Sequence, residues 1–273
     1  MENKQIEIYS KLAVKAAIGA GKKILEVYNQ DDFEIEFKAD NSPLTKADKA
    51  ANNIITSVLD ITKLPVISEE GNIEEFELRR DWKWYWLVDP LDGTKEFIKR
   101  NGEFTVNIAL MHKTRPWLGI IYVPVLNKMY YSDHENAWMV ENLDVDGKEE
   151  NIFIEIESRK KKLPRFSNEN IVILASKSHL SEETKQNIEK IKQIHPGASV
   201  QNVGSSLKFC YIAEGRADFY PRYGKTMEWD TAAGQAIVEA AGGKVIRMSD
   251  LKPMDYNKES LVNPDFIVTN QKI

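Results

Sequence analysis

The spacing of hydrophobic residues changes several times along the first sixty positions of the chain. Hydrophobic residues recur at helical spacing over residues 6–29 and predict an amphipathic helix. Alternation over residues 34–38 predicts a strand, and the Asn-Ser-Pro segment at residues 41–43 predicts a turn. A second helix then begins at Thr45 or Asp48.

Short hydrophobic runs bounded by turn residues come next and predict a sheet. Most of them are separated by too little chain for a crossover helix, so the sheet is expected to be mainly antiparallel. The runs are residues 65–68, 84–88, 104–111, 118–123 and 137–140.

Beyond about residue 165, strand-like and helical segments alternate, which is typical of an α/β unit with partly parallel strands. The predicted strands are 171–175, 199–203, 217–220, 244–246 and 266–269, and the predicted helices are 181–194, 205–214 and 231–241. The polar stretch 157–170 is the expected boundary. We therefore predict an N-terminal α+β domain over residues 1–165 and a C-terminal α/β domain over residues 166–273.

Composition narrows the class of protein. The chain has 273 residues, is 42% hydrophobic and 29% charged, and carries a net charge of −5, which argues against a nucleic-acid-binding protein. Its one cysteine, Cys210, lies in a hydrophobic run, so no internal disulfide is expected. No hydrophobic stretch is long enough to span a membrane and the N-terminus does not resemble a signal peptide, so the expected location is the cytoplasm.

Five acidic residues follow short hydrophobic runs in three separate segments. They are Glu69 and Glu70 in V-I-S-E-E, Asp89 and Asp92 in W-L-V-D-P-L-D-G-T, and Asp230 in E-W-D-T-A-A. Two carboxylates 4 Å apart repel by roughly 4 kcal/mol at an effective dielectric constant near 20. A cluster of them at the edge of a core therefore predicts divalent cations bound through oxygen atoms, and with them phosphate chemistry.

Each acidic segment also has an ordinary structural explanation. The Asp-Gly pair at residues 92–93 is a good turn, residues 69–70 suit a solvated loop, and Asp230 suits the N-cap of the helix over residues 231–241. The combination favours a site, because D-P-x-D-G-T fixes five residue types in six positions and would arise by chance in about one chain of this length in ten thousand.

The spacing within that motif suits both a cation and an anion. Asp89 and Asp92 lie three residues apart across a turn that begins at proline, and the carbonyl of Leu91 falls between them. Gly93 and Thr94 then begin a short helix, whose free amides attract an anion.

The kind of metal follows from the ligand types. The acidic set contains no cysteine and the four histidines are scattered, so oxygen ligands favour Mg²⁺ or Mn²⁺ over Zn²⁺. The sequence has no G-x-G-x-x-G fingerprint, P-loop or G-x-S-x-G elbow, which argues against a dinucleotide-binding fold, a P-loop nucleotide hydrolase and a serine hydrolase.

At these residues the chain resembles the Mg²⁺-dependent, lithium-sensitive inositol monophosphatase superfamily. Three longer segments, at residues 38–48, 85–110 and 204–210, narrow the resemblance to the 3′(2′),5′-bisphosphate nucleotidases of the CysQ type. The similarity extends from about residue 9 to 269. It implies a layered αβαβα sandwich of the inositol monophosphatase and sugar phosphatase type.

The resemblance implies that the substrate is 3′-phosphoadenosine 5′-phosphate (PAP), cleaved to AMP and phosphate in sulfur metabolism, with its sulfated form PAPS as a second candidate. It also implies two or three Mg²⁺ ions, replaceable by Mn²⁺, and inhibition by Li⁺ and Ca²⁺. The implied metal ligands are Glu69, Asp89, the Leu91 carbonyl, Asp92 and Asp230.

The same resemblance implies attack on phosphorus by water activated between two metal ions. Asp48 would take a proton from the hydroxyl of Thr94, so that the pair acts as a general base. Glu70 would support the metal ligands or orient the water. Without the resemblance, Thr94 and Asp48 are ordinary residues of a first helical turn.

The implied substrate contacts belong to both halves of the chain. They are Gly93, Thr94, His179, Ser205, Lys208, Arg222 and Asp230. Ser205 is expected to open a helix after Gly204, which suits a phosphate, and Arg222 to hold the non-reacting phosphate. For His179, a loop residue without a role is an equal alternative.

Two competing functions stay open at this point. The first is an inositol or sugar monophosphatase, which would have the same metal site. The second is a non-catalytic sensor of metal or phosphonucleotide on the same fold. Oligomeric state and peripheral association with the inner face of the cell membrane are not decided by the sequence.

Overall fold

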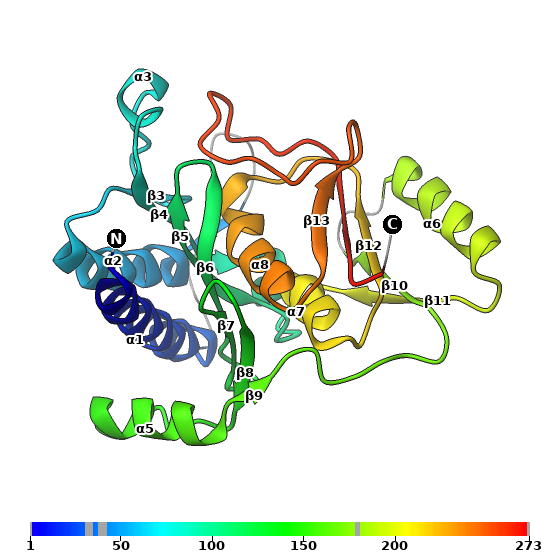
Figure 1. Ribbon diagram of the computed structural model, residues 1–273. Helices are drawn as coiled ribbons and strands as arrows, with labels where there is room; N and C mark the ends of the chain where they lie inside the picture. The colour runs from blue at the N-terminus through cyan, green and yellow to red at the C-terminus, as the bar shows by residue number, and fades with distance from the viewer. Residues whose placement is uncertain (1, 31–34, 38–42, 178–180, 272–273) are drawn as a thin grey trace.

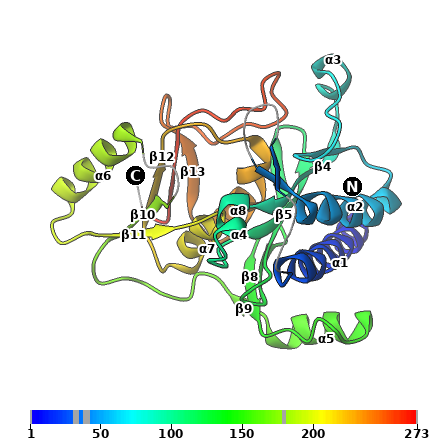
Figure 2. The ribbon, with the colours of Figure 1, turned by 180° about the vertical axis from the view of Figure 1, so that it is seen from behind.

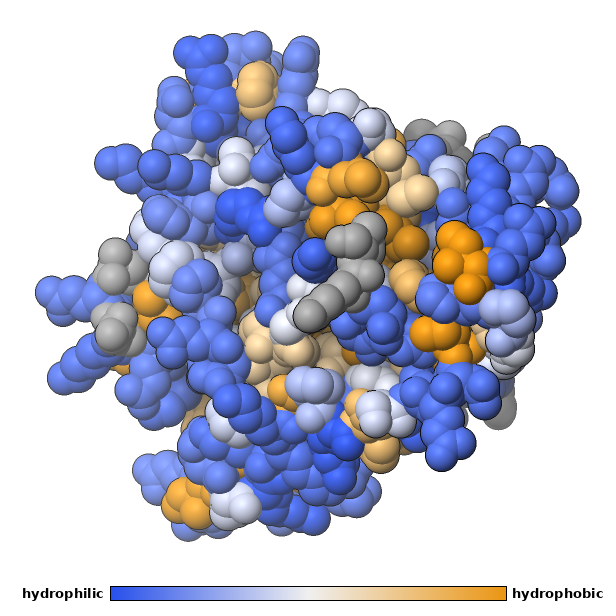
Figure 3. All heavy atoms as spheres, turned by 45° about the vertical axis from the view of Figure 1, so that its right-hand side comes forward, coloured by the Kyte–Doolittle hydropathy of each residue, from blue (hydrophilic) through white to orange (hydrophobic). Residues whose placement is uncertain are grey.

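A computed structural model describes residues 2–30, 35–37, 43–177 and 181–271. The predicted turn at residues 41–43 is described only from Pro43 onward, and His179 lies outside the described residues. No helix within the described ranges is both long enough and hydrophobic enough to cross a membrane. The face shown in Figure 3 is mostly hydrophilic, with its hydrophobic side chains in separate patches.

Five layers of helices and sheets make up the molecule (Figures 1 and 2). Two helices pack on one face of a seven-stranded sheet, and two further helices lie between this sheet and a five-stranded sheet. A last helix covers the outer face of the five-stranded sheet. In that order the helices are α1 (Asn3–Tyr28), α2 (Lys46–Leu59), α7 (Leu207–Glu214), α8 (Glu228–Ala240) and α6 (Glu182–Ile194). The αβαβα sandwich implied by the resemblance is confirmed.

The seven-stranded sheet is antiparallel except at one edge, where β3 and β4 run parallel. Its strand order follows the chain from β3 to β9. The strands are β3 (Val66–Ser68), β4 (Trp84–Asp92), β5 (Thr105–His112), β6 (Arg115–Val123), β7 (Lys128–Ser132), β8 (Ala137–Glu141) and β9 (Lys161–Lys162).

The five-stranded sheet is mixed, with the order β11-β10-β12-β14-β13. Strand β10 runs parallel to β11 and β12, whereas β14 is antiparallel to β12 and β13. The strands are β10 (Val172–Ser176), β11 (Ser199–Val203), β12 (Phe219–Arg222), β13 (Lys244–Arg247) and β14 (Phe266–Thr269). Partly parallel pairing in this half agrees with the prediction.

Smaller elements connect these layers. They are the hairpin of β1 (Ile35–Phe37) and β2 (Pro43–Thr45), the 3₁₀ turn η1 (Asp60–Thr62), and the helices α3 (Phe76–Arg79), α4 (Thr94–Ile98) and α5 (Glu149–Arg159). The sequence did not predict β2, β7, α3, α5 or β9, because each is short or interrupted by polar residues.

Three hydrophobic clusters fill the spaces between the layers. Strand β4 contributes side chains to two of these clusters, because successive side chains alternate between the two faces of the sheet. Trp86 and Val88 point into the cluster beneath α1 and α2, whereas Tyr85 and Leu87 point into the cluster around α7 and α8. Helix α8 belongs to the C-terminal half of the chain but packs on β4, β5 and β6 of the N-terminal half. Residues of both halves therefore meet at its first turn.

Two predicted helix starts are wrong by a few residues. Helix α8 begins at Glu228, so Asp230 is its third residue rather than its N-cap. Helix α7 begins at Leu207, so Ser205 precedes it and has a left-handed backbone with φ of 52°. Both shifts change the role of the side chain, because a residue inside a first turn and one before it point in different directions.

Candidate active site

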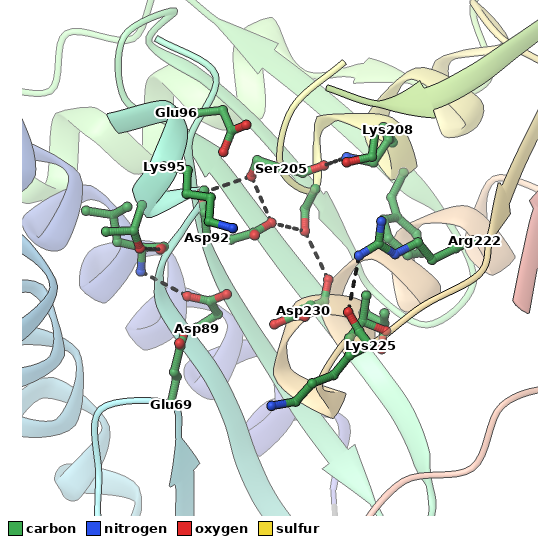
Figure 4. A pocket seen from close by; sticks show the side chains of 18 of the residues that line it. Glu69, Asp89, Asp92, Lys95, Glu96, Ser205, Lys208, Arg222, Lys225 and Asp230 are labelled. Carbon is green, nitrogen blue, oxygen red and sulfur yellow. Dashed lines mark hydrogen bonds between the residues drawn. The ribbon is translucent and has the colours of Figure 1, made fainter. Parts of the chain in front are cut away.

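A cavity of about 260 Å³ lies between the two sheets, at the N-terminal ends of α7 and α8. Its walls come from the ends of β3 and β4, the start of α4, the loop before α7, the end of β12 and the first turn of α8. Figure 4 shows the carboxylates of Glu69, Asp89, Asp92 and Asp230 directed toward this common space. Segments separated by more than a hundred residues in the sequence thus supply one concave site.

Parallel pairing at the sheet edge brings the first two carboxylates together. Strand β3 ends opposite the middle of β4, with Ser68 beside Val88. The amide of Glu69 continues the pairing by donating to the carbonyl of Val88 at 3.2 Å. The next residue on each strand is therefore acidic, which places Glu69 beside Asp89.

A β-bulge in β4 brings Asp92 to the same face as Asp89. Asp89 pairs with Asn107 and Asp92 with Thr105, so the register shifts between the two acids. In a regular strand, residues three apart point to opposite faces. The extra residue reverses that alternation, and both carboxylates line the cavity while Leu91 packs into the core on the other side.

Asp230 approaches from the opposite wall. Its carboxylate accepts a hydrogen bond from the amide of Met227 at 2.8 Å, which closes the first turn of α8. This bond leaves the remaining carboxylate oxygen for the cavity that Asp230 lines. The N-terminal position in a helix also favours its negative charge.

The electrostatics of these acids suit a cation. Burial, followed by the charges of Glu69 and Asp92, raises the pKa of Asp89 well above its ordinary value. Burial and then the charge of Asp92 raise the pKa of Asp230 in the same way. Within the described ranges no three acidic, histidine or cysteine side chains already surround a single metal position. The donors are nevertheless all oxygens around one cavity, so a bound divalent cation would relieve the repulsion between them.

The predicted pair of Asp48 and Thr94 forms beside this cluster. The hydroxyl of Thr94 lies 3.1 Å from Oδ1 of Asp48, to which it donates. The other oxygen of Asp48 accepts from the amide of Thr45 at 2.7 Å, as part of the capping box of α2. Burial raises the pKa of Asp48, so its carboxylate is a stronger base than an exposed one.

Two cationic side chains close the cavity at the C-terminal half. The Nζ atom of Lys208 donates to the carbonyls of Val203 and Ser205 at 3.1 and 2.6 Å, and burial lowers the pKa of Lys208 to about 8. Arg222 is 7% exposed, and its Nη2 donates to the carbonyl of Lys225 at 3.1 Å (Figure 4). Positive charge therefore faces the carboxylates across the cavity.

Comparison with known proteins agrees with this arrangement. The model of the inositol monophosphatase family matches residues 6–272, which is nearly the whole chain. The chain belongs to the inositol monophosphatase family.

Several relatives in this family carry a more specific name. The 3′(2′),5′-bisphosphate nucleotidase CysQ of Buchnera aphidicola is 47% identical over 84% of this chain and 80% of its own. The protein of that name from Escherichia coli K12 is 44% identical over 93% of this chain and 96% of its own.

Solved structures agree with the sequence comparison. The crystal structure of CysQ from Bacteroides thetaiotaomicron has a TM-score of 0.85 and 44% identity, and the match covers 96% of this chain and 97% of that one. An inositol monophosphatase from Thermotoga maritima is 23% identical with a TM-score of 0.70, and it supports the fold alone.

Not every residue expected from the family resemblance reaches the cavity. Gly93 lines it at the start of α4, in a left-handed conformation with φ of 94°. Glu70 follows Glu69 but is not among the lining residues, so its supporting role stays a prediction. Ser205 lines the cavity, but its hydroxyl donates to Asp92 at 2.8 Å.

The sequence missed the residues that hold Asp92. Ser206 donates to the same carboxylate oxygen at 2.6 Å, and Asn107 approaches it at 3.4 Å. The hydroxyl of Thr105 lies 2.9 Å from Asn107 and 2.8 Å from that of Ser205. One signal was available: Thr105 and Asn107 are polar residues two apart in an otherwise hydrophobic strand, which places both on one face.

Proposed function

We propose that this protein is a Mg²⁺-dependent 3′(2′),5′-bisphosphate nucleotidase that hydrolyses the 3′-phosphate of PAP to give AMP and phosphate. The observation that carries the proposal is a cavity in which four converging carboxylates face Lys208 and Arg222. Carboxylates suit a divalent cation, and the two basic side chains suit a substrate that keeps a second phosphate after the reaction. The 44% identity with curated CysQ proteins over 93% of the chain supports the same substrate.

The metal-binding groups of the proposal all line the cavity. They are the carboxylates of Glu69, Asp89, Asp92 and Asp230 and the lining residue Leu91, whose backbone carbonyl lies 3.4 Å from the Thr94 hydroxyl. When bound, Mg²⁺ would lower the pKa of a water molecule and stabilise negative charge on the phosphate oxygens.

Thr94 and Asp48 provide the route for the proton. During hydrolysis a water oxygen bonds to phosphorus while the bond to the 3′-oxygen of the ribose breaks. The water loses a proton, and the departing 3′-oxygen takes up a proton from solvent to become a hydroxyl of AMP. Thr94 lines the cavity and donates to Asp48, so a proton given to the Thr94 hydroxyl can pass on to the carboxylate. Asp48 is buried and carries a raised pKa, which suits it to accept that proton at neutral pH.

Lys208 and Arg222 provide the attraction for the nucleotide. Both side chains are buried, at 5% and 7% exposure, so their charges are only weakly screened by solvent. Arg222 offers a planar fork that can hold a phosphate through two bonds, whereas the Lys208 ammonium acts as a point charge.

Phosphate release by the purified protein tests the proposal. With Mg²⁺, PAP should be cleaved far faster than inositol 1-phosphate, and chelation of the metal should stop turnover. Faster cleavage of inositol 1-phosphate would identify an inositol monophosphatase instead. An absence of turnover on PAP, PAPS and inositol 1-phosphate would favour the non-catalytic sensor.

Metal content, inhibition, substrate preference, oligomeric state and location can each be measured separately. We expect two or three Mg²⁺ per site by calorimetry, activity with Mn²⁺, and inhibition by Ca²⁺ and by millimolar Li⁺. Turnover of PAP that is unchanged at such Li⁺ concentrations would remove that expectation. Rates on PAP and PAPS would give the preferred substrate, sedimentation the oligomeric state, and cell fractionation the cytoplasmic or membrane-peripheral location.

A further inference from the structure

One carboxylate outside the cavity joins the two halves of the site. Glu103 lies between α4 and β5, and both of its oxygens have partners in the C-terminal half of the chain. Lys177, directly after β10, donates to Oε1 at 2.6 Å. The backbone amide of Gly204, in the loop before α7, donates to Oε2 at 2.7 Å. Glu103 thus fixes two segments beside the cavity without being one of its lining residues.

The segments that meet at this junction leave no room for a side chain at either glycine. A Cβ atom added to Gly204 would lie 2.8 Å from Cγ of Glu96 and 2.9 Å from Oε2 of Glu103. A Cβ atom on Gly93 would lie 3.0 Å from the carbonyl oxygen of Glu103 and 3.2 Å from Cβ of Ser205. Two glycines therefore let the turn after β4, Glu103 and the loop before α7 pack directly together.

The loop that Glu103 fixes contacts both a predicted metal ligand and a predicted phosphate-binding residue. Ser205 and Ser206 donate to Oδ2 of Asp92 at 2.8 and 2.6 Å. The carbonyl of Ser205 accepts from Lys208 at 2.6 Å. A displacement of Gly204 would therefore move the groups that orient one predicted metal ligand and one predicted phosphate contact.

We propose that Glu103 is a positioning residue for the reaction. Its bond to the Gly204 amide sets the loop of residues 204–206, which aims the Asp92 carboxylate into the cavity and holds Lys208 beside it. Lys177 keeps the Glu103 carboxylate in place and neutralises its charge. The inference rests on the proposed cation-dependent phosphatase function.

Substitutions that separate the two contacts test the proposal. Glu103→Ala removes both, Lys177→Met removes only the ion pair, and Glu103→Gln keeps an oxygen that can accept from Gly204. Glu141→Gln is a matched control, because Glu141 pairs with Lys161 at 2.7 Å on β8, away from the cavity, and the two side chains are 37% and 41% exposed. The side chains of Glu103 and Lys177 are 26% and 37% exposed.

Mg²⁺ binding to each variant, measured by calorimetry without substrate, is the main readout. We expect Glu103→Ala to weaken binding by about tenfold or more, as loss of a supporting hydrogen bond around a metal site does. Glu103→Gln and Lys177→Met should each change it by less than about threefold, and Glu141→Gln should leave it unchanged. The KM for PAP should rise in Glu103→Ala, because Lys208 is held by the same loop.

Three outcomes would overturn the positioning role. The first is wild-type Mg²⁺ affinity in Glu103→Ala, and the second is an equal loss in Glu103→Ala and Lys177→Met, which would assign the effect to the ion pair. The third is a lower melting temperature without weaker Mg²⁺ binding, which would make Glu103 merely structural.

A second variant covers the case in which Glu103→Ala does not fold. Gly204→Ala keeps the Glu103 side chain but adds a methyl group 2.9 Å from its Oε2, which should push the carboxylate away from the amide of residue 204 and weaken Mg²⁺ binding similarly; unchanged binding would contradict the proposal. Failure of the wild-type protein to cleave PAP would refute the proposed nucleotidase function, whereas the Mg²⁺ measurements judge Glu103 independently of substrate.

Discussion

Ser206 donates a hydrogen bond to Asp92 across 114 positions of sequence, with 2.6 Å between Oγ and Oδ2. The same hydroxyl lies 3.0 Å from the carbonyl of Asp230, in the first turn of α8. One side chain thus links the bulge of β4 to the helix that carries the last predicted metal ligand. Of the three side chains that approach Oδ2 of Asp92, Ser206 makes the shortest contact, ahead of Ser205 at 2.8 Å and Asn107 at 3.4 Å, so it contributes most to orienting this carboxylate.

Ser206→Ala should therefore weaken Mg²⁺ binding by about 10–100-fold, the usual cost of losing a group that supports a metal ligand. Calorimetry with Mg²⁺ in the absence of substrate measures it. Ser158→Ala is the control, because the exposed Ser158 hydroxyl donates to the backbone carbonyl of Glu155 within α5, at 3.0 Å. Equal Mg²⁺ affinity in both variants would show that Asp92 does not depend on Ser206.

Asp89→Asn should have opposite effects on activity and on stability. Removal of this carboxylate should lower the turnover of PAP at least about a hundredfold, because it takes a central ligand from the cation. The metal-free variant should melt at a higher temperature than the metal-free wild type, because the raised pKa of Asp89 means that its ionised form opposes folding at neutral pH. Mg²⁺ should raise the melting temperature of the wild type but not that of the variant.

The sign of the pH effect on stability follows from the same pKa. The folded state holds a proton on Asp89 at pH values where the unfolded chain has lost it. Stability of the metal-free wild type should therefore increase as the pH falls from neutral toward the ordinary aspartate value, and this gain should be smaller in Asp89→Asn. Thermal melts at several pH values in chelator measure it, and identical profiles would contradict the prediction.

Thr94→Val and Asp48→Asn should each reduce kcat by about 10²–10⁴-fold, the range typical of general-base catalysis. Wild-type activity should fall as the pH decreases through the raised pKa of Asp48, because only the ionised carboxylate accepts a proton. Asp48→Asn should lose that acidic limb of the profile. If Asp48→Asn is slow but its activity still falls at low pH as in the wild type, the titrating group is not Asp48.

Nucleotide binding should weaken as the pH rises above neutral, because Lys208 loses its proton in that range. Burial lowers its pKa to about 8, so the ammonium form that attracts phosphate disappears above that pH. The dissociation constant for PAP should increase by about tenfold between pH 7 and pH 9 if only the charged form binds. Lys208→Met should bind PAP weakly and with little change over this range. Arg222→Met is the control, because it should weaken binding yet keep the pH dependence.

The sequence predicted the layers and most of the cavity, and the reasons are local. Hydrophobic periodicity located α1, α2 and most strands, because each buries one face. The acidic motifs identified Glu69, Asp89, Asp92 and Asp230. Each of these residues follows a short hydrophobic run, and such runs end at the edge of a core. Strand β7 was not predicted, because its K-M-Y-Y-S sequence is short and its polar and hydrophobic residues do not alternate.

The tertiary structure decided where the side chains of those motifs point. Asp89 and Asp92 share a face only because a bulge adds one residue to β4, and a bulge depends on pairing with β5 rather than on the motif itself. Ser205 was expected to bind phosphate, but its contact with Asp92 arises from a loop that packing places beside β4.

What the sequence by itself determined is therefore the set of chemical groups and the elements that carry them. Both follow from side-chain type and from spacing along the chain. Only the tertiary structure decided that Ser206, Asn107 and Glu103 support the site, because each acts on a partner from a distant part of the chain. Contacts of this kind depend on how layers pack, which periodicity along one segment does not encode.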